Sequence, residues 1–172
     1  MKIGIVFGCF IPLHTGHMSL IEQSFAENDK TIIAVCGRTS DRGKDFIPFE
    51  DRIKLIKQKY NIPNVIISVI DDDKIFMDGT FTLENWIRWG RELFDSAKIS
   101  PDKYDYTWYT GEPSYKEKLQ IVYPNHKFIL VDRNINTISG TKIRNNPLEY
   151  KDLIAPEFLE YLKQKGIINY EA

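Results

Sequence analysis

The sequence predicts an α/β fold: a Rossmann-like, doubly wound parallel sheet of about five strands, with helices on both faces and a helical C-terminus. Three observations predict it. Short β-rich runs recur along the chain, these runs are apolar throughout, and helical patterns separate them. Strands of this kind are buried on both faces, and right-handed crossovers place the intervening helices over the sheet. The chain of 172 residues has the size of one compact domain, so we expect residues 1–172 to form a single domain.

The first half of the chain alternates strands with helices. Apolar runs predict three strands, over residues 3–7, 31–36 and 65–70. Gly8 closes the first strand, and a proline-containing loop leads from it into a helical pattern. A polar stretch over 37–45 predicts a loop before a helix that begins near Phe49. Turn-forming residues at 61–64 precede the third strand.

The second half continues the alternation. Apolar side chains recur with a helical period after Thr82, which is placed to cap that helix. The residues of this stripe are Leu83, Trp86, Ile87, Gly90, Leu93, Phe94 and Ala97. A strand, a helix and a strand are expected next, over 106–109, 114–122 and 127–131. From Ser139 onward the pattern is helical and is broken at Pro147 and Pro156.

Composition and charge exclude several classes of function. A formal net charge of −1 provides no basic field, so we expect no nucleic-acid partner. No window approaches the roughly 20 apolar residues of a membrane span, and the N-terminal apolar run is too short for a signal peptide. Cys9 and Cys36 lie in apolar, strand-like runs and are expected to be reduced, buried thiols. A cytoplasmic location follows, and homo-oligomerisation is left open.

The loop after the first strand carries the first functional motif. Residues 8–17 read Gly-x-Phe-x-Pro-x-His-x-Gly-His and run into a helix. Gly8 and Gly16 let the backbone approach a ligand, and a helix N-terminus attracts phosphate. His14 and His17 can lie on one face and donate hydrogen bonds to a leaving pyrophosphate. An isolated histidine would be interpreted as an ordinary loop or helix residue, but this long, ordered pattern favours phosphate binding. No Cys or carboxylate follows at the spacing of zinc ligands, so a zinc site is not expected.

A second motif follows the fifth strand, over residues 138–144. Ser139 is placed as a helix N-cap, and a helix that begins there offers backbone N–H groups, hydroxyls and the Arg144 guanidinium to the β- and γ-phosphates of a nucleoside triphosphate. Alone, the motif would indicate a capped helix with a solvated arginine. Together with the first loop it favours a triphosphate site, because ligands of such sheets bind beyond the carboxyl ends of the strands.

The two motifs together resemble the HxGH nucleotidyltransferase superfamily. The longer strings are most similar to the nicotinamide mononucleotide (NMN) adenylyltransferase domain of bacterial NadR proteins, and the resemblance spans nearly the whole chain. Its further landmarks are Glu50-Asp51-Arg52, Trp86-x-x-Trp89, Gly111-Glu112-Pro113 and Val131-Asp132. The resemblance implies ATP and NMN as substrates, NAD and pyrophosphate as products, and Mg²⁺ as cofactor.

The resemblance also implies roles for individual residues. The expected catalytic residues, which bind the triphosphate, are His14, His17 and Arg144. The expected ATP-binding residues are Gly8, Phe10, Gly16, Gly111, Asp132, Ser139 and Thr141. The expected NMN-binding residues are Arg52, Trp86 and Trp89. No side chain is assigned as a metal ligand.

The reasoning from residues leaves alternatives open at the acceptor pocket. Periodicity places Trp86 within the apolar stripe and Trp89 at its edge, so a nicotinamide ring could stack on either indole, or Trp86 could pack in the core. Arg52 could pair with the acceptor phosphate or bridge to an acidic neighbour. The acidic run 71–73 is expected to be a solvated loop.

Cys9 departs from the family pattern, which usually has Lys or Arg between the glycine and the phenylalanine of the first motif. A phosphate contact is then missing, because a thiol supplies no fixed positive charge. Three rival functions stay open. They are transfer to another acceptor such as pantetheine phosphate or nicotinate mononucleotide, cytidylyl transfer, and a nucleotide-sensing module that binds NAD or ATP without turnover.

Overall fold

The computed structural model describes every residue except 38–45, 77–80, 132–137 and 170–172. It contains a five-stranded sheet in which all strands are parallel and the order is β3-β2-β1-β4-β5. The strands are β1 (Lys2–Gly8), β2 (Lys30–Cys36), β3 (Val65–Ile70), β4 (Asp105–Thr110) and β5 (Lys127–Leu130). The predicted fold class is confirmed. The strand order reverses between β1 and β4, which is where sheets of this type bind ligands.

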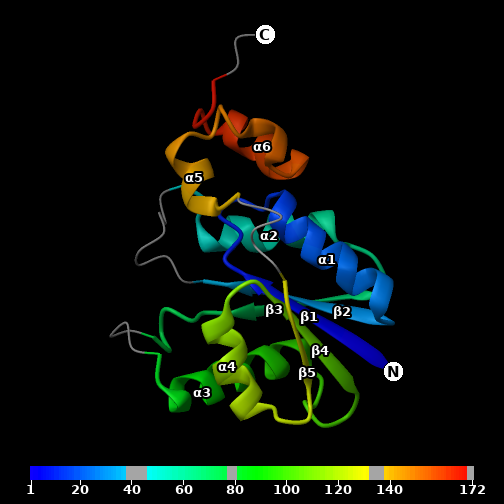
Figure 1. Ribbon diagram of the computed structural model, residues 1–172. Helices are drawn as coiled ribbons and strands as arrows, with labels where there is room; N and C mark the ends of the chain where they lie inside the picture. Colours follow the sequence, from blue (N-terminus) through cyan, green and yellow to red (C-terminus); the bar gives the residue numbers. More distant parts are fainter. Residues whose placement is uncertain (38–45, 77–80, 132–137, 170–172) are drawn as a thin grey trace.

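Helices cover both faces of the sheet. The α-helices of the described residues are α1 (Thr15–Glu27), α2 (Phe49–Lys59), α3 (Leu83–Ala97), α4 (Pro113–Val122), α5 (Gly140–Asn145) and α6 (Pro156–Gln164), and Lys151–Leu153 forms a 3₁₀ turn. Figure 1 shows α3 and α4 on one face, α1 and α2 on the other, and α5 and α6 beyond α1 and α2. None of the helices in the described parts of the chain combines the length and apolar character needed to cross a membrane.

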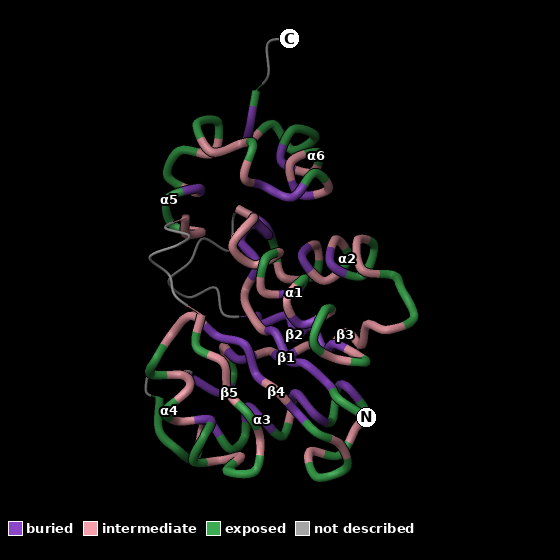
Figure 2. The backbone as a smooth tube through the Cα atoms, turned by 45° about the vertical axis from the view of Figure 1, so that its right-hand side comes forward, coloured by how far each residue is buried: buried purple, intermediate pink, exposed green. Residues whose placement is uncertain are grey.

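The central strands are buried on both faces, as their uninterrupted apolar sequences predict. In β1, Ile5 packs with the α3 side of the core, whereas the next residue, Val6, packs with the α1 side. Neighbouring Ile32 and Ile33 of β2 divide between the two faces in the same way, and all four side chains are fully buried. Figure 2 shows this buried band running through the sheet. Alternate side chains of one strand therefore anchor opposite helical layers.

Helix α3 has the predicted N-cap, because the Thr82 hydroxyl accepts a hydrogen bond from the backbone N–H of Asn85 at 3.2 Å. Its buried stripe differs from the predicted one. The buried residues are Trp86, Trp89, Gly90, Leu93, Phe94 and Ala97, whereas Leu83 and Ile87 are 39% and 41% exposed. The stripe is rotated relative to the prediction, so that Trp89 lies well inside the core and not at its edge.

Candidate active site

A cleft of about 800 Å³ opens at the carboxyl ends of β1 and β4, where the strand order reverses. It is bounded by the loop after β1, the start of α1, the residues that follow β4, and the start of α5. The sequence-predicted residues that line it are Gly8, Phe10, His14, Gly16, His17, Trp86, Trp89, Gly111, Ser139, Thr141 and Arg144. Asp132, which was also predicted to bind ATP, lies outside the described residues. The fold thus brings most of the predicted site together.

The two motifs are in direct contact although 133 residues separate the contacting pair. The Arg144 guanidinium donates a hydrogen bond from Nη1 to the Ile11 carbonyl oxygen at 2.8 Å, and Nη2 donates to the Thr141 hydroxyl at 3.2 Å. A Cβ atom on Gly140 would lie 2.8 Å from Arg144 Nη1 and 3.1 Å from the Ile11 oxygen, so the close approach needs glycine. Ser139 caps α5 as predicted, because its hydroxyl accepts from the Lys142 N–H.

The two histidines are oriented by the backbone around them. His14 is the N-cap of α1. Its side-chain Nδ1 accepts a hydrogen bond from the backbone N–H of Gly16 at 3.1 Å, and its backbone N–H donates to His17 Nδ1 at 3.3 Å. The rings stack with centroids 3.8 Å apart. Because each Nδ1 is an acceptor, the neutral imidazole carries its proton on Nε2. Each ring is then a hydrogen-bond donor through Nε2.

Burial sets the charge of His14. The side chain is 5% exposed, and loss of solvation lowers its pKa from 6.5 to about 4. In the absence of an anion His14 is therefore neutral at pH 7, and its one ring N–H is on Nε2.

Phe10 and Gly8 position His17. The Phe10 ring is 1% exposed and packs edge-on against the His17 imidazole at a centroid distance of 5.0 Å. Phe10 has a φ of 55°, in the left-handed region, which turns the chain sharply after β1. A Cβ atom on Gly8 would lie 3.1 Å from the Phe10 ring. The glycine of the motif therefore makes room for the phenylalanine that packs on the His17 imidazole.

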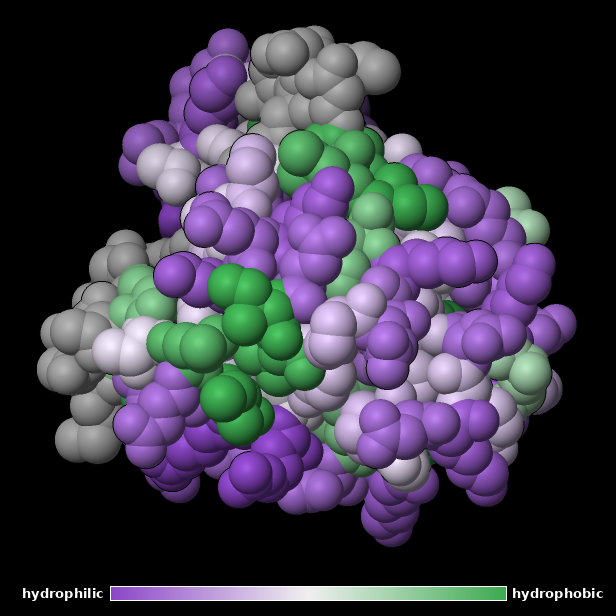
Figure 3. Space-filling model, turned by 60° about the horizontal axis from the view of Figure 1, so that its bottom comes forward, coloured by the Kyte–Doolittle hydropathy of each residue, from purple (hydrophilic) through white to green (hydrophobic). Residues whose placement is uncertain are grey.

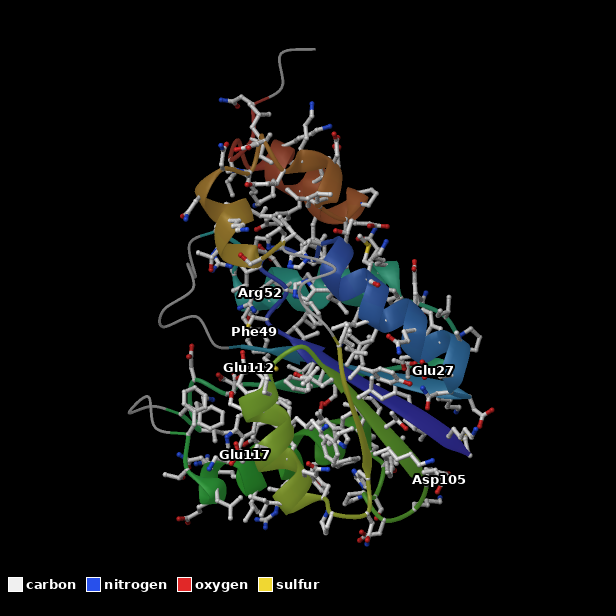
Figure 4. The ribbon with its side chains drawn as sticks, in the orientation of Figure 1. Glu27, Phe49, Arg52, Asp105, Glu112 and Glu117 are labelled. Carbon is white, nitrogen blue, oxygen red and sulfur yellow. The ribbon has the colours of Figure 1, made fainter. Side chains whose placement is uncertain are left out.

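The structure does not bring Arg52 into the cleft. Its side chain is fully buried in α2 and donates to the backbone carbonyl oxygens of Ile47 (3.1 Å), Cys9 (2.7 Å), Cys36 (2.8 Å) and Gly37 (3.5 Å). Figure 4 shows Arg52 above the end of the sheet, beside Phe49. Within the described part of the chain, the Arg52 side chain bonds to backbone carbonyl oxygens and to no carboxylate. The missed signal was that Arg52 precedes the buried Ile56 by one helical turn and so shares its inward face.

Both predicted tryptophans belong to an aromatic wall of the cleft. Trp86 and Trp89 are 3% and 2% exposed. Trp89 packs edge-on against Phe7 at 5.1 Å, and Trp86 lies 5.4 Å from the Tyr115 ring. Trp86 therefore packs in the core and also lines the cleft, whereas the sequence posed core packing and stacking on a nicotinamide ring as alternatives for it. The wall also contains Phe76 and Phe81, stacked at 4.7 Å, which no sequence motif indicated.

Carboxylates reach the cleft from two elements. Asp72 is only 6% exposed and lines the cleft, so the expectation of a solvated acidic loop is wrong for this residue. Glu112 caps α4 by accepting from the Ser114 N–H at 3.5 Å and also lines the cleft; Figure 4 labels it at the start of that helix. The described residues contain no group of three or more His, Cys, Asp or Glu side chains that could hold a metal ion.

A second hollow, of about 600 Å³, lies between α3 and α4. Ile87, Phe94 and Tyr123 are among its lining residues, and none of the sequence-predicted site residues is. Figure 3 shows apolar patches among polar side chains on this side of the molecule. The cleft at the strand ends is therefore the candidate active site.

Comparison with known proteins agrees with this geometry. The cytidylyltransferase-like family model matches residues 5–146. The chain is 31% identical over 170 residues to the trifunctional NAD biosynthesis/regulator protein NadR of Escherichia coli K12, covering 90% of this chain and 39% of NadR. It is 28% identical over 142 residues to a phosphopantetheine adenylyltransferase of Lachnoclostridium phytofermentans, covering 82% of this chain and 72% of that one.

Crystal structures of NadR superpose on this fold. The complex with NR gives a TM-score of 0.77 at 29% identity and covers 91% of this chain and 44% of NadR. The complex with NAD and AMP-PNP gives a TM-score of 0.74 at 30% identity and covers 91% of this chain and 45% of NadR. The chain thus spans less than half the length of the NadR proteins it matches. From the family model and the shared fold, the chain belongs to the cytidylyltransferase-like family of nucleotidyltransferases.

Proposed function

We propose that this chain transfers the adenylyl group of ATP to NMN, forming NAD and pyrophosphate. The observation that carries the proposal is that the His14 and His17 imidazoles and the Arg144 guanidinium line one cleft at the reversal of strand order. The similarity to NadR supports it, because a NadR structure contains both NAD and AMP-PNP, and AMP-PNP has the adenosine and triphosphate layout of ATP.

The chemistry requires positioning and charge stabilisation and no covalent enzyme intermediate. An oxygen of the acceptor phosphate attacks the α-phosphorus of ATP in line, the bond from the α-phosphorus to the bridging oxygen breaks, and pyrophosphate leaves. The Nε2–H groups of His14 and His17 donate to oxygens of the α/β-phosphate region, and Arg144 binds the β/γ end. These donors are held by the backbone before ATP arrives, so they stabilise the growing charge on pyrophosphate without reorganisation.

Mg²⁺ fits the cleft as a cation carried in by ATP. The described residues provide no cluster for a protein-built cage, and Mg²⁺ usually keeps several waters and binds substrate phosphates with one or two carboxylates. Asp72 and Glu112 are the carboxylates in the described lining that could contact the ion or its waters. The ion would neutralise phosphate charge.

The aromatic wall supports NMN as the acceptor. Trp86, Phe81 and Tyr115 line the cleft, and Phe81 is 39% exposed. A flat, cationic nicotinamide ring gains from stacking on aromatic faces, whereas phosphopantetheine has no ring to stack. The phosphopantetheine adenylyltransferase relative nevertheless makes that acceptor the second candidate.

The test is a panel of acceptors. Purified protein with Mg²⁺ and either ATP or CTP is given NMN, nicotinate mononucleotide or phosphopantetheine, and products are identified by liquid chromatography with mass detection. We expect NAD from ATP and NMN. His17→Ala should lower the rate roughly 10²- to 10³-fold, and Glu22→Ala, an exposed change in the same helix, should not.

Each other result contradicts part of the proposal. Dephospho-coenzyme A as the main product would replace NMN by phosphopantetheine as acceptor. Product from CTP alone would replace adenylyl by cytidylyl transfer. ATP binding without product from any acceptor would favour a sensor, and NAD formation unaffected by His17→Ala would remove the histidine from the mechanism.

A further inference from the structure

The two cysteines of the chain stand side by side at the end of the sheet. Strands β1 and β2 are parallel neighbours, and their last paired positions are Gly8 and Val35. The next residue in each segment is a cysteine: Cys9 directly follows β1, and Cys36 is the last residue of β2. Neighbouring strands lie about 5 Å apart, and partners in register place their side chains on the same side of the sheet. Cys36 belongs to the α3 side of the core, and Cys9 packs against that side as well as against the opposite one.

Arg52 gives an independent measure of this proximity. Its Nη1 donates to the Cys9 carbonyl oxygen at 2.7 Å and to the Cys36 carbonyl oxygen at 2.8 Å. One nitrogen atom that bonds both oxygens holds the two carbonyl oxygens no farther apart than the sum of these distances. A disulfide needs Cα atoms about 4.4–6.8 Å apart, a range that includes the usual spacing of neighbouring strands. Both residues are thiols in this structure.

The pair also lies where a small oxidant can reach it. Cys9 and Cys36 both line the cleft of about 800 Å³. Cys9 is half-buried, whereas Cys36 is 4% exposed. Burial, helped by nearby Asp72 and Cys9, raises the pKa of Cys36 well above its usual range, so oxidation should begin at Cys9.

We propose that Cys9 and Cys36 form a redox-sensitive dithiol, which hydrogen peroxide converts into a disulfide that impairs nucleotide binding in the cleft. The Cys9 thiol ionises, its thiolate attacks one peroxide oxygen, and the O–O bond breaks to give a sulfenic acid and hydroxide, which takes up the released proton to form water. The Cys36 thiol then attacks the Cys9 sulfur and gives up its proton to the hydroxide that is displaced, which leaves as water. In total, two thiols and one peroxide give one disulfide and two waters. The effect on nucleotide binding rests on the proposed function; the disulfide itself does not.

The disulfide would disturb the site through the loop after β1. Its Cβ atoms must come within about 3.5–4.5 Å, closer than the usual spacing of parallel strands, so Cys9 moves toward β2. Phe10 follows Cys9 directly and packs on the His17 ring at 5.0 Å. A displacement of about 1 Å at a catalytic group can cost roughly 10²-fold in rate. We expect oxidation to weaken ATP binding at least about tenfold and to lower activity roughly tenfold to a hundredfold.

The experiment treats the full chain with hydrogen peroxide and follows three readouts. They are intact mass, the number of thiols that react with iodoacetamide after denaturation, and the affinity for ATP from equilibrium titration. Cys9→Ser and Cys36→Ser are the matched variants, each compared with its own untreated sample. We expect the unsubstituted chain to lose two hydrogens and both reactive thiols, with reversal by dithiothreitol, and neither variant to form an internal disulfide.

The outcomes separate the two proposals. Two reactive thiols after treatment, a stable addition of oxygen at Cys9, or a disulfide between chains would overturn the dithiol. An internal disulfide that leaves ATP affinity unchanged would overturn its effect on the cleft. If the untreated chain neither binds ATP nor forms product, the proposed function fails, while the mass and thiol count still decide whether the disulfide forms.

Discussion

Replacing Arg52 tests whether this residue serves the protein backbone or the acceptor phosphate. Its guanidinium donates three bonds of 2.7–3.1 Å and a longer one of 3.5 Å, all to buried or partly buried carbonyl oxygens. A hydrogen bond to a charged group contributes about 1.5–3 kcal/mol, and a buried group left without its partner costs about 1–3 kcal/mol. The losses are not additive, because several bonds share one side chain. We expect Arg52→Met to lower the free energy of unfolding by about 3–5 kcal/mol.

Urea unfolding followed by circular dichroism measures this loss, with a matched thermal scan. A decrease of 1 kcal/mol lowers the Tm of a chain this size by about 2–4 °C. Arg52→Lys should recover only part of the stability, because one ammonium cannot span carbonyls on separate segments. Lys54→Met, exposed on the same helix, should change stability by less than about 0.5 kcal/mol. If Arg52→Met unfolds within about 1 kcal/mol of the parent and only the acceptor KM rises, the phosphate role is right and our reasoning is refuted.

Three further predictions concern separate parts of the structure. Burial lowers the pKa of His14 from 6.5 to about 4, so the unfolded chain takes up this proton first as the pH falls. His14 therefore lowers the free energy of unfolding progressively as the pH falls from 6.5 to 4, by at most about 3 kcal/mol. His14→Gln should make the urea midpoint depend less on pH across that window, and an equal pH dependence in parent and variant would contradict the prediction. Gly140→Ala places a Cβ 2.8 Å from Arg144 Nη1, which should displace the guanidinium and raise the KM for ATP about tenfold or more with little change in Tm; an unchanged KM would show that the contact with Ile11 is dispensable. Thr82→Ala removes the N-cap of α3 and should lower the free energy of unfolding, measured with urea, by about 1 kcal/mol. An unchanged free energy of unfolding would show that the cap does not form in solution.

Much of the candidate site could be predicted because the residues of each motif lie close together in the sequence. The first motif lies between a strand and a helix, and its glycines and histidines are close in sequence, so their spacing alone indicated a phosphate loop. Ser139 and Thr82 were recognisable as N-caps for the same reason: a cap bonds to a backbone group three residues away. These bonds need no knowledge of the rest of the chain.

Other assignments required the packed molecule. Trp89 was placed at the edge of its helix by periodicity, yet it is 2% exposed, because Phe7 of β1 and Trp108 of β4 cover it. Asp72 belongs to an acidic run that resembles a solvated loop, yet the fold turns its side chain into the cleft wall. A hydrophobic pattern records which face of an element is apolar and does not record what lies opposite that face.

By itself, the sequence determined the alternation of strands and helices, the parallel sheet, and the two motifs that belong to a nucleotidyltransferase, because each depends on residue types at short spacings. Only the tertiary structure decided that Arg52 bonds to backbone carbonyls, that Arg144 reaches the loop of His14, and that Cys9 lies beside Cys36. These contacts follow from the order β3-β2-β1-β4-β5, which brings together segments far apart in the chain. Strand order is set by how crossovers pack the whole core, and a local pattern contains no record of it.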